Sequence, residues 1–285
     1  MGNRVTIIIL LAMFIGACSM KPAESTNEIN GKLFIIGGGH KPTSMVQKMI
    51  KESGIREGGY GIVLPMSSSV PDTSAYYGML QFQELGIENM HAFNFADSNL
   101  KSVDAKLDSL RNATLVYIPG GVQGRFMKAV YNTPGLEKAI KEAYAKGALI
   151  AGTSAGAAIM SEIMITGDQK NYPEYTSTFY HLEKGNIITA EGLGLITGVI
   201  IDQHFIARAR NNRLLTAIME FPGHIGIGID ESTAIVVQGA KVKVVGKSQV
   251  IVYRNLSGSA HVQNGKIASQ NIRLDIYLPG ETFSI

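Results

Sequence analysis

The sequence predicts an α/β protein with a mostly parallel sheet that is covered by helices on both faces. Short, nearly continuous apolar runs alternate with segments of helical periodicity from residue 33 to residue 160, a pattern typical of parallel strands buried on both sides. Glycine-rich turns follow three of these runs, at residues 37–39, 120–121 and 152–156. The last third of the chain has alternating strands without helices between them, which predicts antiparallel hairpins at a sheet edge.

The expected elements follow one another in regular order. The first strands are expected at 33–36, 60–66, 91–95, 113–118 and 148–151, with helices at 43–53, 74–86, 101–110 and two within 122–146. Later strands are expected at 199–201, 223–229, 233–238, 241–245, 250–254 and 272–278. No linker interrupts the pattern, so residues 31–285 are predicted to form a single domain, which is long enough to bury one sizeable core.

Charge and cysteine content exclude several classes of function. The chain of 285 residues has a net charge of +3 with scattered Lys and Arg, so no nucleic-acid surface is expected. Cys18 is its only cysteine; the domain that follows can therefore form no internal disulfide and has no cysteine nucleophile. Metal-binding motifs such as H-E-x-x-H are missing, and residues 37–40 lack the spacing of a dinucleotide fingerprint, so neither metal nor cofactor is expected.

The N-terminus is typical of an exported lipoprotein. Arg4 precedes an apolar run at 5–15, which is shorter than the roughly 20 residues of a membrane-spanning helix. Ile15-Gly-Ala-Cys18 resembles the bacterial lipobox, in which the cysteine is lipidated; the alternative is an ordinary signal peptide with an incidental cysteine. We therefore expect a lipoprotein signal peptide at 1–18, a flexible tether at 19–30, and a membrane-anchored protein of the periplasm or cell surface.

Ser154 is the first candidate catalytic residue. Residues 152–156 (GTSAG) have the form G-x-S-x-G, directly after an apolar strand and before a helical stretch. In that setting a sharp turn exposes the serine hydroxyl above the carboxyl ends of the strands, where open parallel sheets form their sites. The same turn puts Ser154 at a helix N-terminus, so it is either a nucleophile or a helix N-cap.

A serine nucleophile needs a base within hydrogen-bond reach. His204 ends the run 199–204 (VIIDQH), just after an apolar strand and at the edge where the glycine turns are also expected. His40, which directly follows the first glycine turn, is its rival. The remaining histidines of the domain have no comparable setting and are expected to be structural or surface residues.

The base in turn needs an acidic residue that orients it, and the reaction needs donors to an oxyanion. Asp202, Asp230 and Glu231 are the candidate carboxylates, and alternation along the strand does not choose between the last two. The backbone N–H of Ala155 supplies one donor. The turn at 120–121 either supplies the second, since glycine allows close approach, or is a plain turn.

Three arginines follow His204 in the sequence. Arg208, Arg210 and Arg213 lie four, six and nine positions after it. On a helix Arg210 and Arg213 share a face while Arg208 is displaced. The group is either a site for substrate carboxylates, bound by forked hydrogen bonds, or a solvated basic face.

Four motifs together resemble the cyanophycinase family of serine peptidases, which also contains aspartyl dipeptidase (peptidase E). They are 118–123 (IPGGVQ), 152–157 (GTSAGA), 201–205 (IDQHF) with the three arginines, and 229–233 (IDEST). They occur in the family's order between about residues 32 and 240. The C-terminal hairpins and the N-terminal leader lie outside this resemblance.

The resemblance implies a fold like that of class I glutamine amidotransferases, with a serine in place of their cysteine. It implies a triad of Ser154, His204 and Glu231, and thereby chooses Glu231 over Asp230. The N–H groups of Gly121 and Ala155 would stabilise the oxyanion. The residues that would line the substrate site are Gln123, Asp202, Gln203, Arg208, Arg210 and Arg213.

Cyanophycinases cut a polymer with a polyaspartate backbone and arginine on each side-chain carboxyl, and they release β-aspartyl-arginine dipeptides. We therefore expect hydrolysis of aspartyl peptide bonds through an acyl-enzyme on Ser154. The alternatives are an aspartyl or isoaspartyl dipeptidase of the same family and a catalytically silent, lipid-anchored binding protein. The sequence leaves a homodimer open.

Two features depart from the family's pattern. The family usually has Gly-Gly-Asp-Gln, whereas Val122 stands here in place of the aspartate. The segment 171–180 (NYPEYTSTFY) is rich in tyrosine and is expected to be either a lid or an insertion. Both bear on the identity of the substrate, and neither touches the expected triad.

Overall fold

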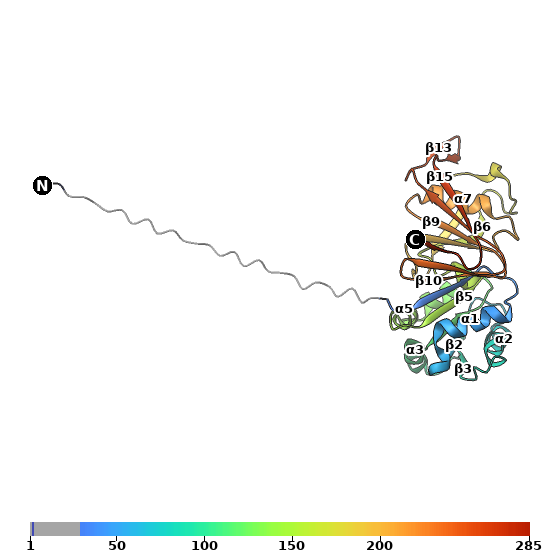
Figure 1. Cartoon of the computed structure of the whole chain (residues 1–285), viewed down its shortest axis with the longest axis vertical. Helices are drawn as coiled ribbons and strands as arrows, with labels where there is room; N and C mark the ends of the chain where they lie inside the picture. The colour runs from blue at the N-terminus through green and yellow to red at the C-terminus, as the bar shows by residue number, and fades with distance from the viewer. Residues whose placement is uncertain (1, 3–28) are drawn as a thin grey trace.

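The computed structural model describes residue 2 and residues 29–285. The expected signal peptide, Cys18 and nearly all of the expected tether therefore lie outside the described residues. Within the described part, the strands form two larger sheets that are stacked along the long axis of the molecule, with helices around them (Figure 1). The expected α/β class with a mostly parallel sheet is confirmed.

The first sheet of the described chain has eight strands in the order β16-β11-β10-β1-β5-β4-β2-β3. Its five members β1, β5, β4, β2 and β3 run parallel, and β10, β11 and β16 extend the β1 edge antiparallel. This antiparallel extension is the expected hairpin at a sheet edge. Its strands are β1 (Lys32–Ile36), β2 (Gly61–Val63), β3 (Met90–Ala92), β4 (Leu115–Ile118), β5 (Leu149–Thr153), β10 (Thr233–Gln238), β11 (Lys241–Gly246) and β16 (Thr282–Ser284).

Both faces of this sheet are covered, as expected. One cluster of buried side chains contains Phe34 and Ile36 of β1 together with residues of the first two helices. Leu33 and Ile35 point to the opposite face, into a larger cluster with the next three helices, because side chains alternate along a strand. The helices are α1 (Thr43–Ser53), α2 (Pro71–Gln83), α3 (Val103–Arg111), α4 (Gln123–Asn132) and α5 (Leu136–Ala145), and a 3₁₀ turn spans Ile55–Glu57.

A second sheet of four strands, in the order β15-β12-β9-β8, was not expected from the sequence. Its strands β8 (Val199–Gln203) and β9 (Ile225–Ile229) are parallel, whereas β12 (Val250–Asn255) and β15 (Ile272–Tyr277) add to β9 antiparallel. Helix α7 (Asn211–Glu220) packs on β9 and β12. β12 and β15 thus pair antiparallel at the edge of a sheet, as expected, but the strand pattern did not indicate that this sheet is separate from the one that contains β10 and β11.

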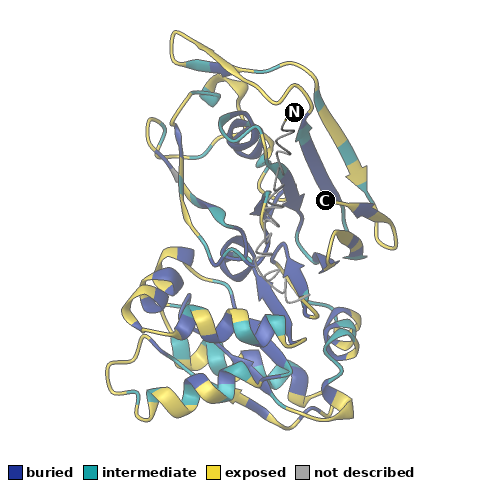
Figure 2. Ribbon diagram, turned by 90° about the vertical axis from the view of Figure 1, so that its left-hand side faces the viewer, coloured by how far each residue is buried: buried dark blue, intermediate teal, exposed yellow. Residues whose placement is uncertain are grey.

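One apolar cluster joins the two sheets. It contains Leu33 and Ile35 of the first sheet, and Ile227, Ile229 and Val252 of the second. The buried residues run through both halves of the molecule without a break, and exposed residues lie on the outer faces of the helices and on the loops (Figure 2). The shared core fixes the carboxyl ends of β5, β8 and β9 relative to one another.

The remaining elements of the described chain are short. Helix α6 (Ala155–Ala158) follows β5 directly, and the hairpin of β6 (Ile163–Gln169) and β7 (Ile187–Glu191) connects it to β8. A 3₁₀ turn at Phe179–His181 lies between β6 and β7, and β13 (His261–Gln263) pairs with β14 (Lys266–Ala268). None of the described helices is long and apolar enough to cross a lipid bilayer.

Candidate active site

The site lies where strand ends of both sheets meet. Ser154 follows β5, His204 follows β8, and Glu231 lies in the short connection that passes from β9 to β10 and so from one sheet to the other. The glycine turn after β1 lies between them: the N–H of Ser154 donates to Ile36 O (3.1 Å), and the N–H of His204 donates to Gly37 O (2.6 Å).

Gly38 shows why this turn must be glycine. Its φ is +113°, and a Cβ at this position would lie 2.3 Å from Cε1 of His204. Any side chain there would displace the imidazole, and the left-handed backbone would strain a non-glycine residue as well. The first glycine turn of the sequence therefore makes room for the histidine.

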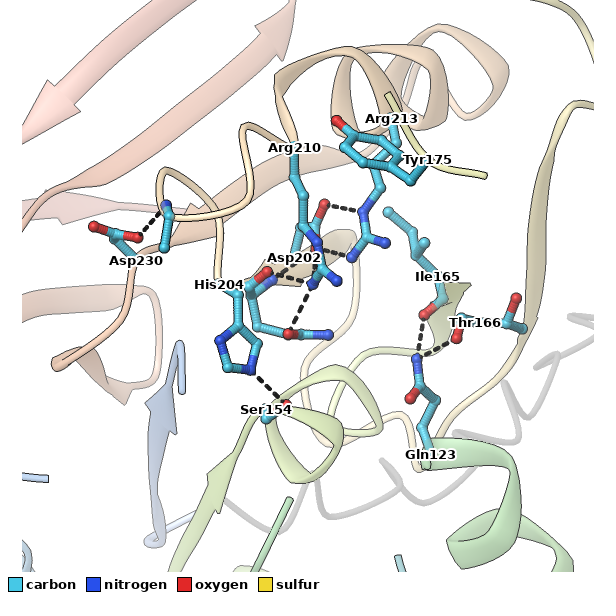
Figure 3. Close-up of polar contacts among 12 residues, drawn as sticks. Gln123, Ser154, Ile165, Thr166, Tyr175, Asp202, His204, Arg210, Arg213 and Asp230 are labelled. Carbon is cyan, nitrogen blue, oxygen red and sulfur yellow. Dashed lines mark hydrogen bonds and ion pairs between the residues drawn. The ribbon is translucent and has the colours of Figure 1, made fainter. Parts of the chain in front are cut away.

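The three side chains of the expected triad are in contact. Nε2 of His204 lies 2.9 Å from Oγ of Ser154, and Nδ1 of His204 lies 2.5 Å from Oε1 of Glu231. Figure 3 shows the imidazole of His204 directed at Ser154. With the proton on Nδ1, the imidazole donates to the carboxylate and accepts from the hydroxyl, which is the arrangement of a serine nucleophile, its base and its orienting acid.

The backbone of Ser154 presents its hydroxyl to the histidine. Its φ is +53° and its ψ −111°, a strained conformation for a residue with a Cβ, at the first position before α6. The side chain makes no capping hydrogen bond to this helix. The hydroxyl thus bonds to His204 and does not act as an N-cap.

The family resemblance names two backbone N–H groups, those of Gly121 and Ala155, as oxyanion donors. In the described part of the chain, neither the N–H of Gly121 nor that of Ala155 has a hydrogen-bond acceptor. A Cβ on Gly120 would lie 3.3 Å from Cβ of Ser154, so the glycine turn is packed beside the serine. Gly121 has φ +145° and stands against Ser67 O, where a side chain would not fit. Both N–H groups are therefore unpaired in the described part of the chain, and the glycine turn that contains Gly121 packs against Ser154 through Gly120.

The pKa of His204 is lowered from its ordinary value of 6.5. Burial is the largest cause; the hydrogen bond to Glu231 raises the pKa, and the positive charges of Arg208 and Arg210 lower it further. The net effect keeps the imidazole neutral near pH 7, the form that accepts a proton.

Asp202 and Arg213 form a buried ion pair. Nε of Arg213 donates to Oδ2 of Asp202 at 2.7 Å, and Nη2 of Arg213 donates to Oδ1. Their side chains are 0% and 3% exposed. Oδ1 of Asp202 also accepts from the N–H of Gln203 (2.7 Å), which directly precedes His204. The family resemblance implied that both residues line the substrate site. In the structure, the carboxylate of Asp202 and the guanidinium of Arg213 instead pair with each other.

Arg210 lies between this pair and the triad (Figure 3). Its Nη1 donates to the backbone oxygen of Gln203 (2.7 Å) and to Oε1 of Gln203 (2.9 Å). Burial, and next the charge of Arg213, lower the pKa of Arg210 to about 10. Arg208 is exposed and forms no ion pair within the described residues. Arg210 also lies 3.9 Å from Oδ1 of Asp202 through Nη1, so Arg208 is the arginine of the three whose charge is least engaged by the protein.

Gln123 begins α4 and is buried, with Nε2 donating to the backbone oxygens of Ile165 (2.9 Å) and Thr166 (2.6 Å) of β6. Val122, which stands in place of the family's usual aspartate, precedes α4 without a capping side chain and is 48% exposed. It lines a cavity of 390 Å³ with Met164 and other residues of α4 and the hairpin. An aspartate at this position would be able to cap α4, whereas valine cannot.

Asp230, which sequence reasoning left beside Glu231 as a candidate, has a different place. Its Oδ1 accepts from the N–H groups of Ile206 (3.1 Å) and Ala207 (2.9 Å), and its Oδ2 accepts from Ser248 Oγ (2.6 Å). It therefore holds the loop that follows His204. His40, the other candidate base, is exposed, and its backbone oxygen accepts from Ser232 Oγ at 2.7 Å.

Sequence reasoning missed Tyr175 and Asn212 as parts of this region. The Tyr175 hydroxyl donates to Ala209 O (2.6 Å) and contacts Oδ1 of Asn212, and burial raises the pKa of Tyr175 to about 12. Nδ2 of Asn212 donates to the backbone oxygens of Thr176 and Thr178, each at 3.0 Å. The tyrosine-rich segment is therefore fastened to the start of α7, beside the arginines.

The layered α/β fold and the linked serine, histidine and glutamate define a serine-type hydrolase. The sequence profile of peptidase family S51 matches residues 33–245, well over half of the chain. The chain therefore belongs to peptidase family S51 and is a serine-type peptidase.

Known proteins of two kinds are similar to the chain. It is 29% identical over 229 residues to cyanophycinase of Synechococcus elongatus, covering 78% of this chain and 69% of the relative. It is 31% identical over 233 residues to cyanophycinase of Trichormus variabilis, covering 79% and 75%. A crystal structure of a peptidase from an acI-B1 Actinobacterium shares the fold, with a TM-score of 0.63 and 22% identity over 90% of this chain and 99% of that one. A putative peptidase E of Listeria monocytogenes gives a TM-score of 0.53 at 21% identity, covering 76% and 99%.

Proposed function

We propose that the protein hydrolyses aspartyl peptide bonds of a cyanophycin-like polymer through an acyl-enzyme on Ser154. The observation that carries this proposal is the continuous contact from Ser154 through His204 to Glu231. The similarity to cyanophycinases at 29–31% identity supports the choice of substrate class.

The proposed reaction has two steps. His204 takes the proton of Ser154 as Oγ attacks the carbonyl carbon, and the N–H groups of Gly121 and Ala155 hold the negative charge on the carbonyl oxygen. The imidazolium then gives this proton to the leaving amine, while Glu231 stabilises the charged ring. Water, deprotonated by the same histidine, attacks the ester, and Ser154 recovers its proton when the acid is released.

The charges around the triad support a substrate that carries free carboxylates. Arg208 and Arg210 lie beside His204, and each lowers its pKa through positive charge. Carboxylates of an aspartyl substrate would offset this charge, and a guanidinium forms forked hydrogen bonds to a carboxylate. Gln203 and Gln123 line the same region in our proposal, whereas Asp202 and Arg213 support the loop that carries the histidine.

Product analysis tests this function against its nearest alternative. The purified protein is incubated with cyanophycin and, separately, with Asp-X and isoAsp-X dipeptides, and the products are identified by mass spectrometry. We expect β-aspartyl-arginine from the polymer. Release of amino acids from the dipeptides with an intact polymer would favour a dipeptidase, and the absence of both reactions would favour a silent binding protein.

The lowered pKa of His204 predicts a pH dependence. Neutral imidazole is the active form, so kcat/KM should rise with pH through an apparent pKa below 6.5 and then level off. Arg208→Gln removes a positive charge that disfavours the imidazolium, so the acid limb should move to higher pH.

The measurement is the midpoint of the kcat/KM–pH profile, which is independent of the height of the profile. Arg208→Lys keeps the charge and is the matched control, expected to leave the midpoint in place. A midpoint that moves to lower pH in Arg208→Gln would refute the proposed effect of this charge on the base.

We also propose that the protein is exported and anchored through a lipid on Cys18, with residues 19–30 as a tether to the peptidase domain. The lipobox-like sequence that ends at Cys18 supports this proposal. An anchored enzyme would act on a polymer outside the cytoplasm.

A further inference from the structure

A cavity of 560 Å³ lies between α4 and the loops that follow β2 and β3. Its lining includes the buried side chains of Met66, Phe95 and Ala129, which are 2%, 7% and 4% exposed. Leu100 and Val103 add further apolar surface. The floor of the cavity is thus able to hold methylene groups of a ligand.

The rim of this cavity is cationic. Arg125 and Lys128 both line it from exposed positions on α4, three residues apart and so on one face of the helix. In the described part of the chain, neither side chain forms an ion pair or a hydrogen bond. Asp97 is the single acidic residue of the lining, and its Oδ1 accepts from the N–H of Asn99 (2.9 Å). Two unpaired cations therefore face one carboxylate, which favours an anionic group.

The cavity adjoins the proposed nucleophile across a single turn. Ser68 lines the cavity, and the preceding residue, Ser67, accepts a hydrogen bond from the N–H of Val122 (2.8 Å). A Cβ on Gly121 would lie 2.1 Å from Ser67 O, while a Cβ on Gly120 would lie 3.3 Å from Cβ of Ser154. Gly120 thus packs against Ser154, and Gly121 packs against Ser67, which directly precedes a residue of the cavity lining.

We infer that this cavity is an accessory subsite that binds a free carboxylate of an extended peptide, which in the proposed polymer is the carboxylate of an arginine branch, while another part of the same peptide lies at Ser154. Arg125 and Lys128 bind the carboxylate, and the methylenes that carry it lie against Met66 and Phe95. The inference rests on the proposed function, because it names where a polymer chain continues beyond the reacting bond.

Binding to an inactive protein tests the subsite without turnover. The probe is a fluorophore-labelled oligo-aspartate peptide, titrated with the Ser154→Ala protein and followed by fluorescence anisotropy. Adding Arg125→Gln and Lys128→Gln should weaken binding about tenfold or more, because two charge-assisted contacts to the carboxylate are lost. Both residues are exposed, so the fold is expected to be retained, as circular dichroism would show.

The matched control removes two other cations from the same background. Lys241 and Lys243 are exposed on β11 and form no ion pair within the described residues, and Lys241→Gln with Lys243→Gln should leave the affinity unchanged. Equal weakening in both double variants would show a general charge effect and overturn the subsite. Unchanged binding in the Arg125/Lys128 variant, or no binding of the peptide at all, would overturn it as well.

This experiment separates the subsite from the proposed function. If the active protein fails to cut cyanophycin but the inactive one binds oligo-aspartate in an Arg125- and Lys128-dependent manner, the substrate proposal fails and the subsite stands. If cyanophycin is cut and the binding is independent of both residues, the subsite alone fails. An oligo-asparagine peptide of the same length controls for contacts other than charge.

Discussion

Replacing Ser154 with alanine should lower kcat by about 10⁴- to 10⁶-fold, because the reaction then loses its nucleophile and keeps only binding and the oxyanion donors. The substitution removes one hydroxyl and leaves the Cβ in place. The cost of the positive φ of +53° is therefore nearly the same in both proteins. The free energy of unfolding should fall by about 1 kcal/mol or less, the contribution of one hydrogen bond.

The control for this result is His40→Ala. His40 is the other histidine at a glycine turn, but it is exposed, and Nε2 of His204 makes the hydrogen bond to the serine. Turnover by His40→Ala should match that of the wild-type protein, whereas His204→Ala should approach the loss seen for Ser154→Ala, since residues that act together are not additive. Near-normal turnover in Ser154→Ala would rule out the proposed acyl-enzyme.

Replacing Asp202 with asparagine should lower the free energy of unfolding by about 3–5 kcal/mol. The side chains of Asp202 and Arg213 are 0% and 3% exposed, and the carboxylate meets two nitrogens of the guanidinium. Removing its charge leaves the guanidinium of Arg213 buried without a counter-charge, which costs far more than the pair itself contributes. Chemical denaturation, with the midpoint and slope both fitted, measures this effect.

Two further variants test whether the loss of stability in Asp202→Asn comes from burial of the ion pair. Glu137→Gln breaks the exposed pair with Lys141, whose side chains are 44% and 46% exposed, and should change stability by less than about 1 kcal/mol. Adding Arg213→Gln to Asp202→Asn should recover part of the lost stability, because it removes the unpaired charge. If Asp202→Asn keeps its stability and only raises KM, the pair is a substrate contact and our interpretation of it is wrong.

The local structure of this protein could be predicted well from the sequence. The expected helix at 43–53 coincides with α1, because its apolar positions have helical spacing and Gly54 ends it in the left-handed conformation (φ +67°). The strands that precede the glycine turns were also expected, since each is a short apolar run. What the pattern could not predict is strand partnership. β9 and β10 are separated by three residues, yet they belong to different sheets.

The site was predictable to the same extent. The sequence identified Ser154 by its turn, and the structure brings it into contact with His204 and Glu231. The sequence could not predict that Arg213 forms a buried ion pair with Asp202 whereas Arg210 donates to Gln203. An arginine in a buried ion pair and an arginine that faces a ligand have the same spacing on a helix. Nor did the sequence indicate that Tyr175 would bond to Ala209, since that contact joins segments 34 residues apart.

Covalent labelling of Ser154 tests the central claim most directly. The purified protein is treated with a fluorophosphonate, digested, and analysed by tandem mass spectrometry. We expect one modified residue, Ser154, and a rate of modification that falls steeply in His204→Gln, because only a hydroxyl deprotonated by a neighbouring base attacks the phosphorus readily. A folded protein that remains unlabelled at Ser154, or that is labelled equally fast without His204, would contradict the account.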